Sequence, residues 1–238
     1  MELYSATIHK ETICGSDEGE TRMRDKDLRK AMREYLEDAD AHSVGALVVD
    51  EFSVDGMDRI DIATVGDTLT GYELKSSSDN LSRLERQVRS YGRVMDYIYL
   101  VTTVSHLKNA RSIIPKWWGI ITVKELPQSI VLKRTRQARS NPDLDSESIA
   151  QLLWRDEALS LLTEKGLDKG YRTKTRAELC RRLANEVNLI ELRRDVRDRI
   201  KGRRGWRESP ILARNDDSLL HADKFPHFLA RRLLTQHR

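Results

Sequence analysis

Hydrophobic and polar residues follow two different periods along the chain, and each period predicts a different element. Between residues 24 and 38, apolar residues recur every three or four positions, which is the spacing of one helix face. They are Leu28, Met32, Tyr35 and Leu36. Three alternating or β-branched runs follow, separated by the turn sequences DGM and GDT, and they cover residues 45–54, 58–65 and 69–76. The pattern predicts a helix followed by an antiparallel meander of three strands.

A second group of elements follows the meander. Asp79 is a suitable N-cap for a helix that reaches about Met95. The apolar face of this helix would comprise Leu81, Leu84, Val88 and Tyr91. The near-continuous apolar run at 96–104 predicts a strand covered on both faces, and a short helix at 107–114 and a strand at 117–123 complete the series. The order α-β-β-β-α-β-α-β predicts an α/β fold, with a mixed sheet flanked by helices.

The chain becomes polar after the last of these strands. We interpret residues 136–147, which include a proline, as a linker. Beyond it the spacing is helical at 154–162 and again from Thr175 to Ile190, where Thr175 and Glu178 have the spacing of a capping box. The predicted division is an N-terminal arm at 1–23, a mixed α/β domain at 24–135, the linker, and a basic all-α extension at 148–238.

Charge is distributed unevenly between the two halves of the chain. The formal net charge is +4 and the sequence pI is about 9.0. Residues 1–150 hold 21 Lys and Arg against 25 Asp and Glu, whereas residues 151–238 hold 21 against 13. A basic part attached to an acidic part suggests a polyanion-binding surface beside a carboxylate-rich site. A solvated helical surface explains the same charges and stays open as the alternative.

Several classes of protein are excluded by composition. No apolar run approaches the ~20 residues that a membrane-spanning helix needs, so we expect no membrane partner. Cys14 and Cys180 are the only cysteines, so a disulfide framework is excluded and a cytoplasmic location is expected. A hydrophobic fraction of 39% with 34% charged residues indicates a folded chain with large solvated helical surfaces.

The register of the meander decides whether its carboxylates meet. If GDT is a three-residue loop, Val65 pairs with Leu69 and Asp61 lies opposite Glu73. A two-residue loop would instead place Asp61 opposite a tyrosine and separate the two carboxylates onto different faces. With DGM as a three-residue loop, Glu51 lies opposite Asp61. Strict alternation would also put Ile60 and Ile62 together on the face opposite Asp61. Odd loops therefore align Glu51, Asp61 and Glu73 across three strands.

Three carboxylates in a row destabilise a sheet unless a cation compensates them. Oxygen ligands without nearby His or Cys favour Mg²⁺ or Mn²⁺ over Zn²⁺. Lys75, two positions after Glu73 on the same face, could neutralise part of this charge or stabilise a charged transition state. The simpler alternative is a solvent-facing ion pair between Glu73 and Lys75.

Asp61 followed by Glu73-Leu74-Lys75 resembles the signature of the PD-(D/E)xK nuclease superfamily. On the next helix, Gln87 and Tyr91 have the spacing of the QxxxY motif of the RecB-like branch. The resemblance covers roughly residues 24–125 and extends to small stand-alone bacterial proteins that add a helical C-terminal extension. The proline of the family motif is missing, because Arg59-Ile60 precedes Asp61. The resemblance implies a restriction-endonuclease-like α-β-β-β-α-β core.

The resemblance also implies roles for individual residues. Asp61 and Glu73 would bind Mg²⁺ or Mn²⁺ with the Leu74 backbone carbonyl, and Lys75 would position or activate the attacking water. Gln87 and Tyr91 would support the site or contact substrate beside Arg83. A third carboxylate would come from Glu51 or from Glu34 or Glu37 on the first helix.

The expected function is metal-dependent hydrolysis of phosphodiester bonds, with DNA as the expected substrate. The alternatives are an RNA-cleaving nuclease and a non-catalytic nucleic-acid-binding or complex-assembly protein on a nuclease fold. Whether the chain forms a homodimer stays open. Further nucleic-acid contacts are expected from the basic stretch 193–207, through Arg193, Arg194, Lys201, Arg203, Arg204 and Trp206.

Overall fold

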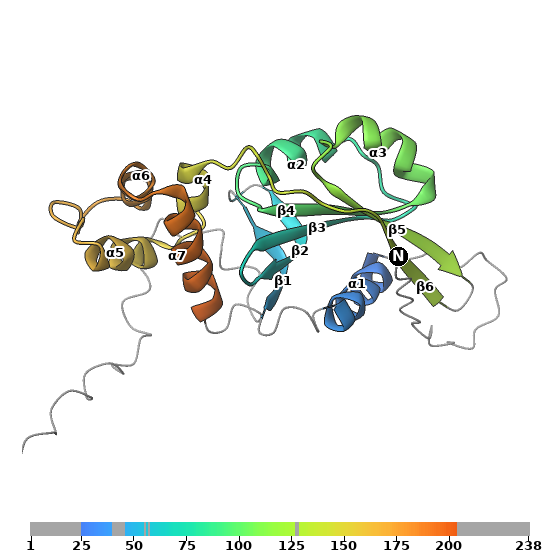
Figure 1. The fold of residues 1–238 in the computed structure, drawn as a ribbon, viewed down its shortest axis with the longest axis horizontal. Coiled ribbons are helices and arrows are strands. Elements are labelled where there is room, and N and C mark those ends of the chain that lie inside the picture. The colour runs from blue at the N-terminus through green and yellow to red at the C-terminus, as the bar shows by residue number, and fades with distance from the viewer. Residues whose placement is uncertain (1–24, 40–45, 55, 57, 127–128, 204–238) are drawn as a thin grey trace, which may run out of the picture.

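A six-stranded mixed sheet forms the centre of the molecule (Figure 1). The computed structural model describes residues 25–39, 46–54, 56, 58–126 and 129–203, so the predicted arm at 1–23 lies outside the described residues. The strands are β1 (Leu47–Ser53), β2 (Arg59–Val65), β3 (Leu69–Lys75), β4 (Tyr97–Thr103), β5 (Gly119–Leu126) and β6 (Ser129–Arg136). They lie in sequence order, with β3, β4 and β5 parallel and the other neighbours antiparallel.

Helices flank this sheet and continue beyond it. They are α1 (Asp25–Ala39), α2 (Leu84–Tyr91), the 3₁₀ turn η2 (Val104–His106), α3 (Leu107–Ile113), α4 (Ser146–Ala150), α5 (Arg155–Glu164), α6 (Arg176–Glu186) and α7 (Leu189–Gly202). The arrangement confirms the predicted α/β fold class, with its α-β-β-β-α-β core and helical C-terminal part. Strand β6 and the short helix α4 were not predicted. Strand β6 continues to Arg136, across a polar stretch where the prediction placed no strand.

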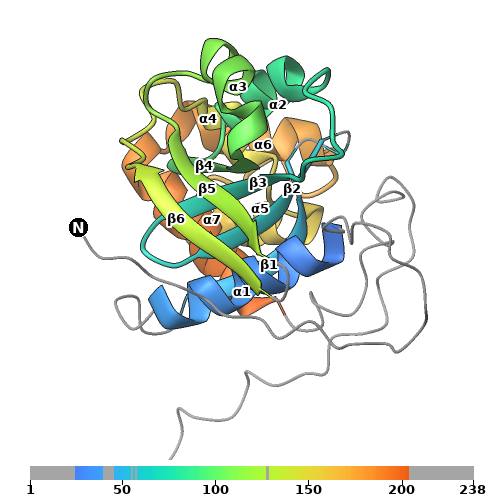
Figure 2. The same cartoon turned by 90° about the vertical axis from the view of Figure 1, so that its right-hand side faces the viewer.

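The two faces of the sheet bury separate hydrophobic clusters. In Figure 2, α1 lies below the sheet and α2 and α3 lie above it. The α1 face includes Leu28 and Met32 of α1 together with Ile62, Tyr72 and Leu74 of the strands. The opposite face includes Val65, Leu84, Tyr91, Leu100 and Ile120. Strands β3 and β4 are buried along almost their whole length because both faces are covered.

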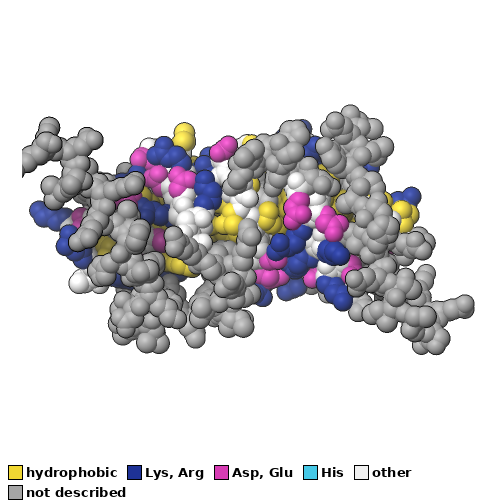
Figure 3. Space-filling model, turned by 90° about the horizontal axis from the view of Figure 1, so that it is seen from below, with side chains coloured by type: hydrophobic (Ala, Val, Ile, Leu, Met, Phe, Trp, Pro, Cys, Tyr) yellow, Lys and Arg dark blue, Asp and Glu magenta, His cyan; other side chains and the backbone are white. Residues whose placement is uncertain are grey.

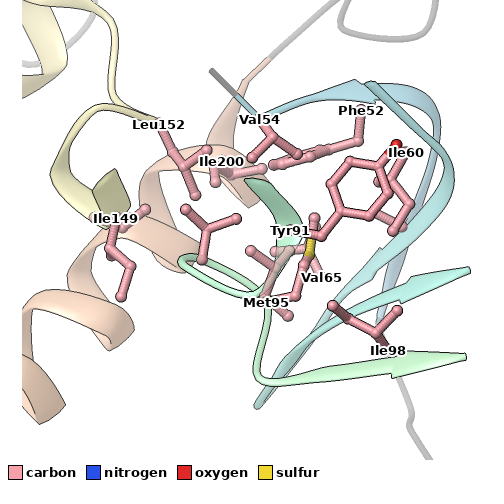
Figure 4. Close-up of a cluster of buried hydrophobic side chains, with 14 of the residues drawn as sticks. Phe52, Val54, Ile60, Val65, Tyr91, Met95, Ile98, Ile149, Leu152 and Ile200 are labelled. Atoms are coloured by element: carbon pink, nitrogen blue, oxygen red, sulfur yellow. The ribbon is translucent and has the colours of Figure 1, made fainter. Parts of the chain in front are cut away.

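The C-terminal helices share the cluster of the α2 face. Ile149, Leu152 and Ile200 belong to the same buried cluster as Phe52 and Val54 of the meander, and Figure 4 shows side chains of both parts within it. The segment 137–145 contains no helix or strand but is tied to the core. The Asn141 side-chain amide donates to the carbonyls of Gly92 and Met95, each at 2.7 Å.

Two helices differ from the prediction, and the first of them, α2, also ends at Tyr91 and not near Met95. Helix α2 begins at Leu84, because Asp79 does not cap it: the Asp79 carboxylate accepts from the Ser76 backbone N–H at 2.7 Å and stabilises the turn after β3. The predicted helix from Thr175 to Ile190 is divided, because Asn188 caps a new helix by accepting from the Glu191 N–H at 3.0 Å. Ile190 is consequently 78% exposed. The predicted capping box of Thr175 and Glu178 is confirmed.

Candidate functional site

The register of the meander is the one that three-residue loops produce. Val65 pairs with Leu69 and Ala63 pairs with Gly71, which excludes the two-residue alternative. Between β1 and β2, the pairs Asp50–Ile62 and Phe52–Ile60 enclose one unpaired position on each strand. Those positions are Glu51 and Asp61, so the two carboxylates lie opposite each other as predicted.

The regular alternation of β1 and β2 ends at these two residues. Ile60 packs on the α2 face, whereas Ile62 packs on the α1 face, so the prediction that they share a face is wrong. Glu51 has φ 51°, a left-handed backbone conformation that is uncommon outside glycine and is often held at functional sites. The irregularity ends the ladder between β2 and β3 at the pair Ile62–Tyr72 and opens the sheet beside Asp61.

Asp61 occupies the place where β2 leaves β3. Its Oδ2 accepts from the backbone N–H of Leu74 at 2.8 Å, a donor that a continued ladder would have paired. Because the N–H and C=O of one strand residue face the same neighbour, the Leu74 carbonyl also faces this opening. The Leu74 backbone carbonyl, which was predicted as a metal ligand, therefore faces the site.

Arg29 of α1 is a site residue that the sequence interpretation missed. Its Nη2 lies 3.2 Å from Asp61 Oδ1 and 2.8 Å from Glu51 Oε1, and its Nη1 donates to the Asp61 carbonyl at 2.7 Å. The only signal in the sequence is its place next to the buried Leu28 on the inner flank of α1. Glu37 of the same helix is exposed, and Glu34 is only partly buried.

Glu73 lies on the α2 face and is almost fully buried, at 1% exposure. Its Oε1 accepts from Lys75 Nζ at 2.7 Å and from Gln87 Nε2 at 2.6 Å. The Tyr91 hydroxyl lies 3.0 Å from Glu73 Oε2 and 2.7 Å from the Arg59 carbonyl oxygen. Both residues of the QxxxY spacing therefore converge on Glu73. The Gln87 side-chain oxygen is buried and has no hydrogen-bond partner within the described part of the chain.

The electrostatics of the two carboxylates favour a proton or a cation. Burial and the nearby charge of Asp61 raise the pKa of Glu73 from 4.5 to about 7, although Lys75 acts in the opposite direction. Burial also raises the pKa of Asp61, against the Leu74 N–H and Arg29. Burial and the Glu73 charge raise the pKa of Tyr91, so its hydroxyl stays protonated. Burial is the main cause of both raised carboxylate pKa values, and Lys75 and Arg29 offset it only in part.

The donor set fits Mg²⁺ or Mn²⁺ in chemistry. Mg²⁺ is held in proteins by one or two carboxylates and retains waters or substrate phosphates, and Asp61, Glu73 and the Leu74 carbonyl supply such oxygens. Across the described ranges, no group of three or more His, Cys, Asp or Glu side chains is arranged to hold a metal ion. An all-protein cage of the kind that binds structural zinc is therefore not what these residues form.

Tyr91 and Arg83 differ in their access to a ligand. Tyr91 is fully buried, so it supports Glu73 and does not reach a surface. Arg83 is exposed at the start of α2.

The basic stretch of α7 is largely neutralised by acidic partners. Arg193 Nη2 lies 2.6 Å from the buried Asp96, and Arg203 pairs with Glu157 at 2.6 Å while stacking on the Trp154 ring. Of the remaining predicted residues of this stretch, Arg194 is exposed and Lys201 pairs with Asp198. Arg204 and Trp206 lie outside the described residues. On the face in Figure 3, described side chains of both signs are intermixed.

Comparisons with known proteins identify a family. A family model described as bacteriophage P4 protein cII matches residues 19–220. Among curated proteins, none matches the chain. A Silicibacter pomeroyi protein of unknown function is 16% identical, with a TM-score of 0.40, over 65% of this chain and 99% of its own. Pyrococcus furiosus SfsA, solved in complex with Ca²⁺, is 15% identical, with a TM-score of 0.32, over 52% of this chain and 69% of its own. Neither likeness is close enough to assign a function.

No helix in the part of the chain that the structure describes is long and apolar enough to cross a membrane.

Proposed function

The chain belongs to the bacteriophage P4 protein cII family, and we propose that it is a metal-dependent nuclease that hydrolyses phosphodiester bonds, with DNA as the expected substrate. The observation that carries the proposal is the convergence of Asp61, Glu73 and Lys75 where β2 and β3 separate. This arrangement supports the resemblance to the PD-(D/E)xK superfamily, because it joins the motif residues in space and not only in sequence.

Burial makes the positive charge of Lys75 effective in stabilising negative charge. The side chain is 6% exposed, and its Nζ lies 2.7 Å from Glu73. A positive charge held in a site from which water is excluded stabilises negative charge developing on a phosphate far better than a solvated lysine would. A Mg²⁺ or Mn²⁺ ion, when bound, would supply a Lewis acid for the phosphate and lower the pKa of a bound water. Asp61, Glu73 and the Leu74 carbonyl are the groups that would hold it.

Gln87 and Tyr91 fix the orientation of Glu73. Both come from the buried side of α2, and their hydrogen bonds to the two carboxylate oxygens leave Glu73 one position. Preorganised polar groups of this kind avoid reorganisation during a reaction. The free Gln87 oxygen could accept a hydrogen bond from a water or ligand proton at the same site.

One observation favours a second candidate function. Arg29 already contributes a positive charge to Asp61 and Glu51, so the carboxylates have a protein cation without any metal. A non-catalytic nucleic-acid-binding protein would have this property. Binding that needs no metal and is unchanged in Glu73→Gln would favour it over the nuclease.

The test is a cleavage assay with purified full-length protein. Labelled linear, circular and single-stranded DNA and a labelled RNA are incubated with Mg²⁺, Mn²⁺ or a chelator. We expect cleavage only with metal, and a loss of roughly 10²–10³-fold or more in Asp61→Asn, Glu73→Gln and Lys75→Met. The RNA arm decides between the two substrates.

Matched controls separate the site from the rest of the surface. Asp67→Asn and Glu85→Gln remove exposed carboxylates from the adjacent turn and from α2, and both should retain wild-type cleavage. Circular dichroism checks that every variant is folded. The proposal fails if the wild-type protein cleaves no nucleic acid with either metal, or if Asp61→Asn and Glu73→Gln cleave like wild type.

A further inference from the structure

A β-bulge in the edge strand β6 changes the direction of one arginine. Arg134 pairs with Ile121 and Arg136 pairs with Ile120, so Thr135 is an extra residue on β6. Directly opposite residues project to the same face of a sheet. Ile121 belongs to the α1 face and Ile120 to the α2 face. The bulge therefore places Arg136 on the side of α2 and α3, whereas Arg134 stays on the other side.

Main-chain oxygens hold Arg136 in this position. Its Nε donates to the Trp118 carbonyl at 2.7 Å and its Nη2 donates to the Pro115 carbonyl at 3.3 Å. These two bonds use one edge of the guanidinium. The other donors of its fork stay available, and a guanidinium fork matches the oxygens of a phosphate or carboxylate.

Two further arginines lie close to these contacts: the Arg139 backbone N–H donates to the Trp117 carbonyl at 2.7 Å, and Arg111 of α3 lies four positions before Pro115. Burial is the main cause that lowers the pKa of Arg136, and the positive charges of Arg111 in α3 and Arg139 after β6 add to it. Within residues 25–39, 46–54, 56, 58–126 and 129–203, none of these three arginines makes an ion pair with an acidic side chain. Gathered like charges without a counter-ion are unfavourable unless an anion joins them. We refer to Arg111, Arg136 and Arg139 as the basic trio.

We propose that the basic trio is a binding site for backbone phosphates of a nucleic acid. Arg136 provides the fixed guanidinium, and Arg111 and Arg139, both exposed, reach the phosphates from the surrounding surface. Because two of the three groups face solvent, the site suits a phosphate on a long chain better than a small molecule in an enclosed pocket. The trio is drawn from two segments, helix α3 and residues 136–139, and the fold brings Arg111 to the basic stretch that holds the other two.

The position of the trio relative to Glu73 supports this ligand. Glu73 pairs with Leu100, Leu100 with Ile120, and Ile120 with Arg136, so Arg136 is level with Glu73 on the same face, three strands across. At the usual spacing of strands this is about 14 Å. That is less than one turn of a duplex, about 34 Å. Because Leu100 and Ile120 between the two sites are buried under the helices of this face, a nucleic acid at Glu73 would reach the trio around these helices. The identity of the anion thus rests on the proposed nuclease function.

The test measures binding without cleavage. Fluorescence anisotropy follows a labelled 20-mer, single-stranded and duplex, with full-length protein in a chelator at several salt concentrations. The variant Arg111→Gln/Arg139→Gln alters only exposed side chains. We expect its affinity to fall roughly tenfold or more, and the slope of log affinity against log salt to decrease by about two, one for each phosphate that the variant no longer neutralises.

The control variant Lys133→Gln/Arg134→Gln removes the same charge from exposed positions of the same strand. Its affinity should change less than threefold. Equal losses in both variants would mean that net charge alone matters and would overturn the site, as would unchanged binding in Arg111→Gln/Arg139→Gln. Arg136→Lys is a second variant, which retains the charge but not the fork and should weaken binding to an intermediate degree.

A further arm distinguishes the sources of phosphate. Inorganic phosphate is titrated by calorimetry into the wild-type protein and into Arg111→Gln/Arg139→Gln. The proposal is overturned if Arg111→Gln/Arg139→Gln loses saturable binding of inorganic phosphate but binds the oligonucleotide as the wild-type protein does. That result would assign the trio to a free anion. None of these measurements requires cleavage. If the nuclease assay fails but nucleic-acid binding still depends on the trio, only the proposed nuclease function is rejected.

Discussion

Two groups of carboxylates in this chain differ in how their charge is compensated. Asp96 is 2% exposed and accepts from the Leu69 N–H at 2.7 Å, with Arg193 and Arg197 at 2.6 and 3.5 Å. Two positive groups thus surround one negative group. At the other site, Glu51, Asp61 and Glu73 are paired with three cations, Arg29, Lys75 and Arg59, the last with its Nε 3.7 Å from Glu51 Oε2.

The difference separates a structural ion pair from the candidate site. The Asp96 group joins α7 to the start of β3, and its donors come from distant parts of the chain, so it stabilises the arrangement of the C-terminal helices. The Glu73 group has no such surplus of positive charge, and burial together with the charge of Asp61 raises the pKa of Glu73. Strongly perturbed carboxylates beside a specific charge partner are typical of functional sites.

The largest expected effect concerns Asp96. Asp96→Ala leaves Arg193 and Arg197 without their shared partner and the Leu69 N–H without an acceptor. We expect a loss of about 3–5 kcal/mol in the free energy of unfolding, measured by urea denaturation. Arg194→Ala, an exposed change on the same helix, should alter it by less than about 0.5 kcal/mol. A loss below about 1 kcal/mol in Asp96→Ala would remove the proposed structural role.

The second prediction concerns the pH dependence of stability. Since the pKa of Glu73 is raised from 4.5 to about 7, the folded chain binds this proton more tightly than the unfolded chain. Stability therefore falls as pH rises from about 4.5 to 7, by about 3 kcal/mol at most from this group. In Glu73→Gln this contribution is absent, so urea midpoints measured at pH 5 and pH 8 should differ less than in wild type. Glu85→Gln should retain the wild-type difference, and an unchanged difference in Glu73→Gln would contradict the assignment.

The smallest expected effect concerns Arg29. If Arg29 competes with a metal ion for Asp61 and Glu51, Arg29→Gln should bind Mn²⁺ about tenfold more tightly in the absence of nucleic acid, which is about 1.4 kcal/mol. Calorimetric titration of Mn²⁺ measures this directly. Arg33→Gln, which removes the next arginine on the same face of α1, one that pairs with Asp50, is the matched control. Unchanged or weaker Mn²⁺ binding in Arg29→Gln would show that the two cations do not compete.

Much of the meander could be predicted from the sequence. Apolar alternation and the two short turns limited the register to two alternatives, and the structure has the three-residue one, which aligns Val65 with Leu69 and Glu51 with Asp61. The reversal between Ile60 and Ile62 could not be predicted. It coincides with the left-handed backbone of Glu51 on the paired strand, and nothing in the residue type indicates that conformation.

Contacts between distant segments account for most of the other differences. Asp79 was a reasonable cap by residue type, but Ser76 competes for its carboxylate. The α7 arginines looked like a free basic surface because Asp96 lies about a hundred positions earlier. Strand β6 was missed because its second half, Lys133–Arg136, is polar. This is usual for an edge strand whose side chains contact solvent.

The bulge at Thr135 also affects how the exposed edge of the sheet can pair with another chain. An edge strand offers unpaired backbone groups to other chains, and long flat edges promote aggregation. In β6 the bulge interrupts the edge where Lys133 and Arg134 add charge, so a second sheet cannot align along its length. Deleting Thr135 would turn Arg136 to the α1 face and flatten this edge in a single step. The proposed phosphate site and the interruption of this sheet edge therefore depend on the same inserted residue.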